Sequence, residues 1–376
     1  MPQTLAADDI VETHAQGAGN GREPLLVLAP LRDYLSRSGL QAPDDLSAQP
    51  IGEGHSNVTF ALSTGVVLRR PPRGPLPPSA HDVLREARLL EALGATGVRT
   101  PKVLGVCADL DVIGAPFYVM ELVAGDVITD SLPAGFDSDA QRSLVADELI
   151  DALVELHAAD WKAIGLEGFG KPSGYLERQL RRFTGLWEHN RTRDLPAVEA
   201  VGRWLADNLP ESGPATIVHG DYRLGNVLYA PASAESAGSA DPAGSAGVAA
   251  SPPRLAAILD WKMATIGDPL ADLGYLLTNW YEAGDTRGPF TLQTVSALPG
   301  FPDRAELVRR YEQRSGRAMR AVDWYVTLAI WKGVVFMEGN YKRAVAGSTD
   351  DPYLRSFGDA VVSLAERALD VTRQGF

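Results

Sequence analysis

The sequence contains a single cysteine, Cys107, among its 376 residues, so an internal disulfide bond is excluded and this thiol is expected to be buried and inert. It also lacks any cluster of Cys and His residues with the spacing of a zinc site. No apolar run approaches the roughly 20 residues that a membrane-spanning helix needs. The N-terminus lacks the basic start and apolar stretch of a signal peptide. These absences favour a cytoplasmic protein without a membrane partner.

Basic side chains are also scarce, because 35 Lys and Arg residues stand against 48 Asp and Glu residues, which gives a formal charge of −13. A nucleic-acid surface needs clustered basic residues to displace phosphate counterions, so nucleic acid is disfavoured as a partner. The acidic excess would suit a cationic substrate, but it is too diffuse along the chain to identify one. A hydrophobic content of 45% and a length of 376 residues indicate a globular protein with two domains or one bilobal domain.

The hydrophobic periodicity divides the chain into a small, strand-rich part and a larger helical part. We expect a flexible tail over residues 1–23, an N-terminal lobe over 24–123 and a C-terminal lobe over 124–376. The expected fold class is therefore α+β, with a small β-rich lobe and a mainly helical lobe. Helices are expected at 25–40, 81–93, 145–156, 198–209 and 325–341, and strands at 65–69, 103–107, 117–122, 216–219, 226–229 and 254–259.

Residues 231–253 consist almost wholly of small residues, since 20 of these 23 are Ala, Ser, Gly or Pro. This composition is typical of a flexible loop. The apolar segments on its two sides are expected to pair as one hairpin, so the loop is an insertion within the C-terminal lobe and not a linker between domains. Doubling the length of a loop costs only about 0.6 kcal/mol, so the fold tolerates such an insertion.

The most informative stretch runs from Ile217 to Leu228. An apolar strand leads into His219-Gly-Asp221, Asn226 follows five residues after the aspartate, and a second apolar strand begins. After the insertion, another apolar strand ends at Asp260. Short polar side chains on tight turns between buried strands are held rigidly. Carboxylate and carboxamide oxygens are the ligands that Mg²⁺ prefers, so these residues are candidates for a metal site.

On these residues the chain resembles the aminoglycoside phosphotransferase superfamily, whose fold is similar to that of protein kinases. The resemblance implies an enzyme that uses ATP and Mg²⁺ to phosphorylate the hydroxyl of a small molecule. It makes Asp221 the catalytic residue, which accepts or orients the proton of the substrate hydroxyl. It makes Asn226 and Asp260 the metal ligands. His219 is interpreted as a structural residue hydrogen bonded to the backbone.

Residues upstream resemble the nucleotide site of the same superfamily. Residues 52–57 look like the loop that covers the nucleotide, Arg69 and Glu86 like the ion pair at its phosphates, and residues 120–122 like the hinge that meets adenine. Arg69 is preferred to Arg70 because it stands at the family's usual lysine position. The resemblance assigns cofactor binding to Ser56, Asn57, Arg69, Glu86, Met120 and Glu121.

Two positions depart from the family pattern. Arg69 replaces the usual lysine, so a planar guanidinium group replaces a compact ammonium group. Lys262 follows Trp261 where an acidic residue is more usual, which changes the charge near the expected metal. A non-catalytic nucleotide-binding protein is therefore one alternative, which the intact Asp221, Asn226 and Asp260 disfavour.

Three segments, 67–72, 156–161 and 174–180, resemble one branch of the superfamily, which is related to the kinase domain fused to some acyl-CoA dehydrogenases. This branch implies a hydroxylated metabolite as substrate, for instance a hydroxyacyl thioester. An aminoglycoside or amino-alcohol kinase is the other alternative. It predicts that carboxylates converge near the catalytic aspartate, and the candidates are Glu282, Asp285 and Glu338. The sequence leaves the oligomeric state and the choice between ATP and GTP open.

Overall fold

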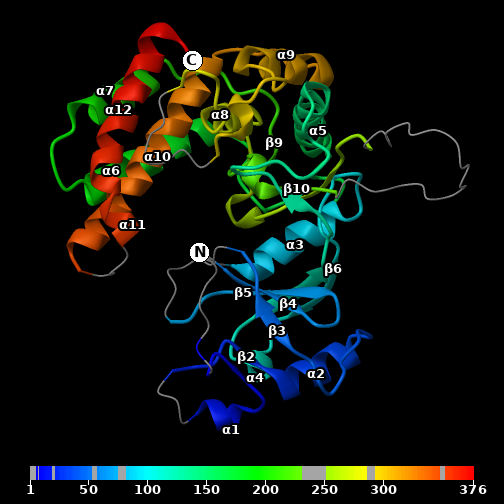
Figure 1. The fold of residues 1–376 in the computed structure, drawn as a ribbon. Coiled ribbons are helices and arrows are strands. Elements are labelled where there is room, and N and C mark those ends of the chain that lie inside the picture. The colour runs from blue at the N-terminus through cyan, green and yellow to red at the C-terminus, as the bar shows by residue number, and fades with distance from the viewer. Residues whose placement is uncertain are drawn as a thin grey trace, which may run out of the picture. The chain divides into compact units, whose positions relative to one another are not determined.

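A computed structural model of the chain describes residues 6, 8–18, 22–52, 57–74, 82–230, 251–285, 293–347 and 352–376. The chain divides into two compact units, Met1–Ala124 and Gly125–Phe376. The first unit is built around a five-stranded sheet and the second is mainly helical, which confirms the α+β class (Figure 1). None of the helices in the described ranges combines the length and the apolar character that a bilayer crossing requires.

The first unit is built on an antiparallel sheet of five strands in the order β3-β4-β5-β7-β6. Its strands are β3 (Ala48–Pro50), β4 (Val58–Leu62), β5 (Val66–Arg70), β6 (Val103–Cys107) and β7 (Phe117–Glu121). One face packs on α2 (Leu28–Arg37) and α4 (Leu110–Ile113), in a core that includes Phe60, Leu68 and Cys107. The helix α3 (Val83–Leu93) contacts β6 and β7 and begins at Asp82, which caps it by accepting the backbone N–H of Arg85.

Part of the segment expected to be a flexible tail is folded. The strand β1 (Ile10–Val11) pairs in parallel with β2 (Leu26–Val27), and α1 (His14–Gly17) begins with a capping box made by Thr13 and Gln16. Asp9 is buried and forms ion pairs with Arg22, at 2.8 Å, and with Arg73. The sequence expectation was wrong here because these short elements are held by caps and ion pairs, which leave no hydrophobic periodicity. Residues 1–5, 7 and 19–21 of this tail lie outside the described residues.

The second unit is organised around the long helix α10 (Val322–Val345). This helix packs against five other described helices, and Trp324 and Trp331 fix it to α7 by donating to the carbonyls of Leu205, at 2.9 Å, and Val198, at 3.0 Å. The other helices are α5 (Asp139–Ala158), α6 (Tyr175–Asn190), α7 (Pro196–Asp207), α8 (Leu270–Thr278), α9 (Arg304–Ser315), α11 (Pro352–Arg355) and α12 (Phe357–Gln374), and Figure 1 labels them.

Two small sheets in the second unit carry the ends of the expected catalytic segments. The strand β9 (Thr216–Val218) pairs with β12 (Thr265–Gly267), and β10 (Val227–Tyr229) pairs with β11 (Leu255–Ile258) and with β8 (Asp126–Val127). The hairpin expected on the two sides of the insertion is therefore confirmed. Residues 231–250 of the insertion lie outside the described residues.

Candidate active site

The loop that carries Asp221 joins strands of two different sheets, β9 and β10. Gly220 turns the chain there with φ +85°, and a Cβ at this position would lie 2.9 Å from the carbonyl oxygen of Met263. Both the positive φ and this close approach exclude a larger residue without a backbone shift. The direction in which Asp221 leaves the turn is therefore set by local sterics.

Asp272, in the first turn of α8, holds the same loop from the other side. Its Oδ2 accepts the backbone N–H of His219 at 2.6 Å, and its Oδ1 accepts the backbone N–H of Gly220 at 2.7 Å. Burial opposes ionisation of Asp272, but the hydrogen bond from His157 Nε2, at 3.2 Å, and these amides outweigh it, so the pKa of Asp272 lies below its usual range. Asp272 is thus an ionised support of the loop that carries Asp221.

His219 is fixed in one tautomer by its backbone partners. The backbone N–H of Asp221 points at His219 Nδ1 over 3.2 Å, and His219 Nε2 lies 2.8 Å from the carbonyl oxygen of Leu259. An amide can only donate and a carbonyl can only accept, so Nδ1 is unprotonated and Nε2 carries the hydrogen. Both nitrogens are occupied in this fully buried ring. The expected structural role of His219 is confirmed, because it has no site left for proton transfer to a substrate.

The Asp221 carboxylate is about four-fifths buried, and Arg223 Nε lies 3.7 Å from its Oδ1. Tyr275, one turn along α8 from Asp272, is a second polar neighbour. Burial and the charge of Asp221 raise the pKa of Tyr275, so the phenol keeps its proton at neutral pH. Sequence reasoning missed Arg223 and Tyr275. The position of Arg223, two residues after the aspartate, was a local signal, whereas Tyr275 is brought in only by the packing of α8.

The two expected metal ligands, Asn226 and Asp260, lie at adjacent strand ends. The backbone N–H of Leu259 donates to the Asn226 carbonyl at 2.8 Å, so Asp260 follows directly beside Asn226. Asn226 Nδ2 donates to the carbonyl oxygen of Asp221 at 2.7 Å, while its Oδ1 accepts no hydrogen bond from any described residue. Asp260 adopts φ +62°, a left-handed conformation that non-glycine residues rarely take outside functional turns.

This pair of oxygen donors fits a magnesium ion bound together with phosphates. Mg²⁺ is usually held by one or two protein carboxylate or amide oxygens, with waters and substrate phosphates completing its shell. Across the described ranges, no group of three or more His, Cys, Asp and Glu residues could hold a metal alone. The departure at Lys262 is visible in the structure, because its Nζ lies 2.7 Å from Asp260 Oδ2. One oxygen of the expected ligand is therefore engaged by an ammonium group.

The nucleotide-site residues of the first unit form their own network. Arg69 Nε donates to Glu86 Oε2 at 3.2 Å, and Asn57 Nδ2 donates to the same oxygen at 3.2 Å. Glu86 is only 3% exposed, and Arg69 Nη1 also donates to Thr59 Oγ1 at 3.1 Å. The expected pairing of Arg69 with Glu86 is confirmed. Ser56 lies outside the described residues.

Arg70 points into the opposite face of the sheet, as strand alternation requires. It is 3% exposed and donates to the carbonyl oxygens of Pro71, at 3.0 Å, and Ile113, at 3.4 Å. Burial lowers the pKa of Arg70 to about 10. The choice of Arg69 over Arg70 as the candidate for binding phosphate therefore agrees with the geometry, because the guanidinium of Arg70 is buried and donates to backbone carbonyls.

The expected hinge lies at the end of β7. Met120 is 9% exposed, and Glu121 Oε1 accepts the backbone N–H of Lys102 at 3.0 Å. The carboxylate of Glu121 thus holds the backbone of the segment that leads into β6. A contact of Met120 and Glu121 with adenine stays a prediction.

The three carboxylates that an aminoglycoside kinase would gather around the catalytic loop have other partners. Glu282 and Asp285 both form ion pairs with Arg304, the first at 3.2 Å. Glu338 is fully buried and accepts the backbone N–H of Thr192, at 3.0 Å, and its hydroxyl, at 2.6 Å. These residues therefore stabilise the helical unit.

Comparison with known proteins agrees with this geometry. The profile described as the phosphotransferase enzyme family matches residues 47–237 and 248–325. Acyl-CoA dehydrogenase family member 11 from Homo sapiens is 32% identical over 356 residues, which cover 93% of this chain and 43% of that protein. Family member 10 from Mus musculus is 32% identical over 333 residues, which cover 86% of this chain and 29% of that protein. The chain thus spans less than half the length of these relatives.

Solved structures share the fold over most of the chain. A Ralstonia eutropha protein assigned as an aminoglycoside phosphotransferase superposes with a TM-score of 0.76 at 30% identity, covering 92% of this chain and 98% of its own. The GDP complex of aminoglycoside 2'-phosphotransferase-IIIa superposes with a TM-score of 0.55 at 18% identity, covering 86% and 92%. The second likeness indicates a common fold only.

Proposed function

The chain belongs to the phosphotransferase enzyme family, and from this premise we propose that it transfers the γ-phosphate of Mg·ATP to the hydroxyl of a small metabolite, for instance a hydroxyacyl thioester. The observation that carries the proposal is the joint placement of Asp221, Asn226 and Asp260 on one rigid loop system. Asn226 is bonded to the backbone of Asp221 and lies beside the end of β11. Phosphoryl transfer depends mainly on such positioning and on neutralising charge.

The chain's own residues have separable roles in this reaction. Asp221 accepts or orients the proton of the attacking hydroxyl, a contribution of about 10²–10⁴-fold for a general base. Asn226 and Asp260 hold Mg²⁺, which supplies neutralisation of the charge that develops on the phosphate oxygens. Arg69, oriented by Glu86, is the candidate for binding the phosphates from the first unit.

The choice of substrate follows from the relatives. Two of them are named as acyl-CoA dehydrogenases, and the present chain matches only part of each. A phosphotransferase joined to an enzyme of acyl thioesters would act on the same class of molecule, in a form that bears a hydroxyl. An aminoglycoside acceptor is the alternative, which the name of the Ralstonia relative favours and the engagement of Glu282, Asp285 and Glu338 elsewhere disfavours.

ATP turnover and nucleotide binding test the proposal separately. Purified protein with Mg·ATP should release ADP with at least one member of a panel of hydroxyacyl thioesters, aminoglycosides and amino alcohols. Asp221→Asn should lower that turnover by at least about 10²-fold and keep the thermal shift caused by Mg·ATP. Asp207→Asn, at an exposed helix end, is the matched control and should behave as the wild type. Absence of any shift with Mg·ATP would contradict the nucleotide assignment.

A further inference from the structure

We propose that Lys332, on α10, binds an anionic group of the acceptor substrate, so that the acceptor is a hydroxylated carboxylate or phosphate compound and not a cationic alcohol. This inference rests on the proposed function, because it concerns the molecule whose hydroxyl meets Asp221. It goes further in assigning a binding residue outside the motifs that carry the resemblance.

Lys332 is an unusual residue for its place in the fold. It interrupts an apolar stretch of α10, between the buried Trp331 and Val334, and its side chain is half-buried. Its Nζ lies 5.0 Å from the centre of the Phe183 ring, and it forms no ion pair or hydrogen bond with any residue that the structure describes. A partly desolvated ammonium that has only an aromatic face as partner is costly to keep. An anionic ligand would remove that cost.

The surroundings of Lys332 connect it to the catalytic loop. α10 packs against α8, which carries Asp272 and Tyr275. The charges of Asp272, of Asp221 and of Arg182 on α6 influence the ionisation of the ammonium. In the proposed arrangement, an acceptor whose hydroxyl lies at Asp221 places its anionic group at Lys332.

A second cation lies on the same aromatic ring. Arg182 Cζ is 5.9 Å from the centre of the Phe183 ring, so the ring carries both a guanidinium and an ammonium. The positive charge of Arg182 disfavours the charged form of Lys332 in the free protein, and a bound anion would offset that repulsion. A cationic acceptor would instead add a third positive charge.

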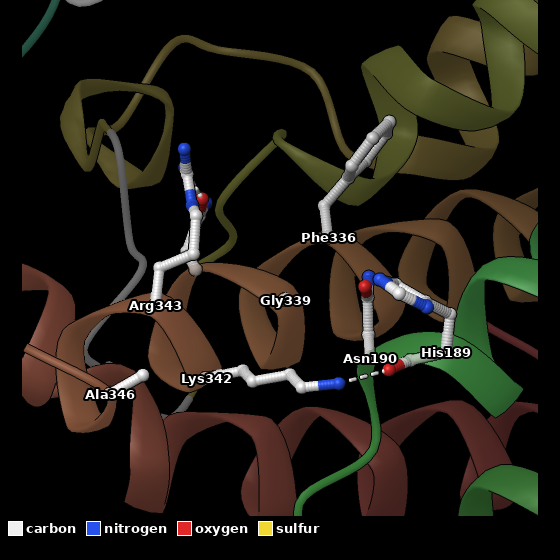
Figure 2. Close-up of a pocket in the computed structure, with 8 residues that line it drawn as sticks. His189, Asn190, Phe336, Gly339, Lys342, Arg343 and Ala346 are labelled. Atoms are coloured by element: carbon white, nitrogen blue, oxygen red, sulfur yellow. Dashed lines mark hydrogen bonds between the residues drawn. The ribbon is translucent and has the colours of Figure 1, made fainter. Parts of the chain in front are cut away.

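The adjoining pocket has the same character. Phe336 lies one helical turn after Lys332 and packs edge-on against Phe183, with ring centres 5.0 Å apart. It also lines a pocket of about 390 Å³ between α6 and α10, shown in Figure 2. No acidic residue lines this pocket, whereas His189, Lys342 and Arg343 do. In a chain with a net charge of −13, such a local absence of carboxylates favours an anionic ligand.

The ionisation of Lys332 agrees with a site that awaits an anion. Burial is the main cause that lowers the pKa of Lys332, to about 8, although Asp272 and Asp221 oppose the shift. A bound carboxylate or phosphate would raise it again by favouring the charged form. The site is therefore charged for much of the time at neutral pH and becomes fully charged when an anion enters.

The test compares molecules that share a skeleton and differ in charge. 3-Hydroxybutyrate, 1,3-butanediol and 4-amino-2-butanol carry the same secondary alcohol beside an anionic, neutral or cationic end. Binding of each to the full chain is measured by calorimetry in the presence of Mg²⁺ and a non-hydrolysable ATP analogue, and kcat/KM is measured with Mg·ATP. 3-Hydroxybutyryl-CoA is the fourth probe and separates the two sources of the anion. If 3-hydroxybutyryl-CoA binds more tightly than the diol and 3-hydroxybutyrate does not, Lys332 binds a phosphate group. If 3-hydroxybutyrate also binds more tightly than the diol, Lys332 binds a carboxylate.

Lys332→Met should remove the preference for the anionic probes, with at least about a tenfold rise in their Kd and KM and no change for the diol. Lys332→Arg should retain the preference, because it keeps the charge. Lys162→Met removes another lysine over an aromatic ring, 5.3 Å from the centre of Trp161, and should match the wild type. Equal affinity for the diol and both anionic probes, or an unchanged preference in Lys332→Met, overturns the inference while leaving ATP turnover intact. Loss of Mg·ATP binding in the wild type would instead overturn the proposed function.

Discussion

The backbone amide of His219 donates to the carboxylate of Asp272 over 2.6 Å, and the residues are 53 positions apart in the chain. Through this bond and the one from Gly220, the first turn of α8 fixes the turn from which Asp221 projects. The position of the Asp221 carboxylate, the proposed catalytic group, therefore depends on a support that the local sequence does not contain.

Gly220→Ala should damage both stability and turnover. Alanine at a positive φ costs about 1–2 kcal/mol, and at Gly220 its Cβ would also lie 2.9 Å from the Met263 carbonyl. Gly39→Ala is the matched control, because Gly39 has φ +74° and no atom within 4 Å of the added Cβ. Chemical denaturation should show a larger loss for Gly220→Ala, with a fall in kcat only there. Equal losses in the two variants would contradict the steric argument.

Acidification should destabilise the protein through His157. Burial lowers the pKa of His157 below its ordinary value of 6.5, even though Asp272 raises it. Because of this lowered pKa, His157 binds a proton more readily in the unfolded chain than in the folded one. The contribution of neutral His157 to the free energy of unfolding is therefore complete above about pH 6.5 and is lost as the pH falls toward the folded-state pKa. Thermal unfolding should show a midpoint that decreases over this range. His157→Gln should be less stable at neutral pH and should show a flatter dependence; an unchanged slope would contradict the assignment.

Removing Lys262 should strengthen magnesium binding. Its ammonium occupies Asp260 Oδ2 at 2.7 Å, and an exposed pair of this kind contributes about 0–1 kcal/mol. Lys262→Ala should therefore lower, by up to about fivefold, the Mg²⁺ concentration that gives half of the ATP-dependent thermal shift. Asp260→Asn should raise that concentration. If both variants match the wild type, Asp260 is not a metal ligand.

Lys332 should link acceptor preference and stability to pH. The folded-state pKa of Lys332, about 8, lies below its ordinary value of 10.5. Protonation of Lys332 therefore destabilises the fold. As a result, the free energy of unfolding decreases as the pH falls from 10.5 to 8. Lys332→Met should therefore raise the thermal midpoint near neutral pH. The preference for 3-hydroxybutyrate over 1,3-butanediol should fall as the pH rises past about 8.

The charged groups that act on Lys332 are Arg182 on α6, Asp272 on α8 and Asp221 on the loop between β9 and β10. The raised pKa of Tyr275, also on α8, keeps its phenol neutral. A lower midpoint in Lys332→Met would indicate a structural lysine and would contradict this assignment.

Several features could be predicted because they depend on neighbouring residues. Strand alternation predicted that Arg69 and Arg70 lie on opposite faces of the sheet. In the structure Arg69 pairs with Glu86, whereas Arg70 donates to backbone carbonyls. The apolar segments around residues 231–253 predicted the pairing of β10 with β11. By contrast, β1 and α1 were missed, because Asp9 and its arginines leave no periodic signal.

The sequence by itself determined the family and the order of Asp221, Asn226 and Asp260. Turn residues and strand patterns depend on residues that are close together in the chain, so they can be recognised without the structure. The resemblance also indicated Asp272 as a support of that loop, but only the tertiary structure decided which backbone amides Asp272 binds and which side chains lie beside the loop. The bond of Asp272 to His219 and the contact of Lys332 with Phe183 join segments that are 53 and 149 residues apart. Such contacts are selected by the burial of helix faces against one another, and α6, α8 and α10 acquire them only when they pack.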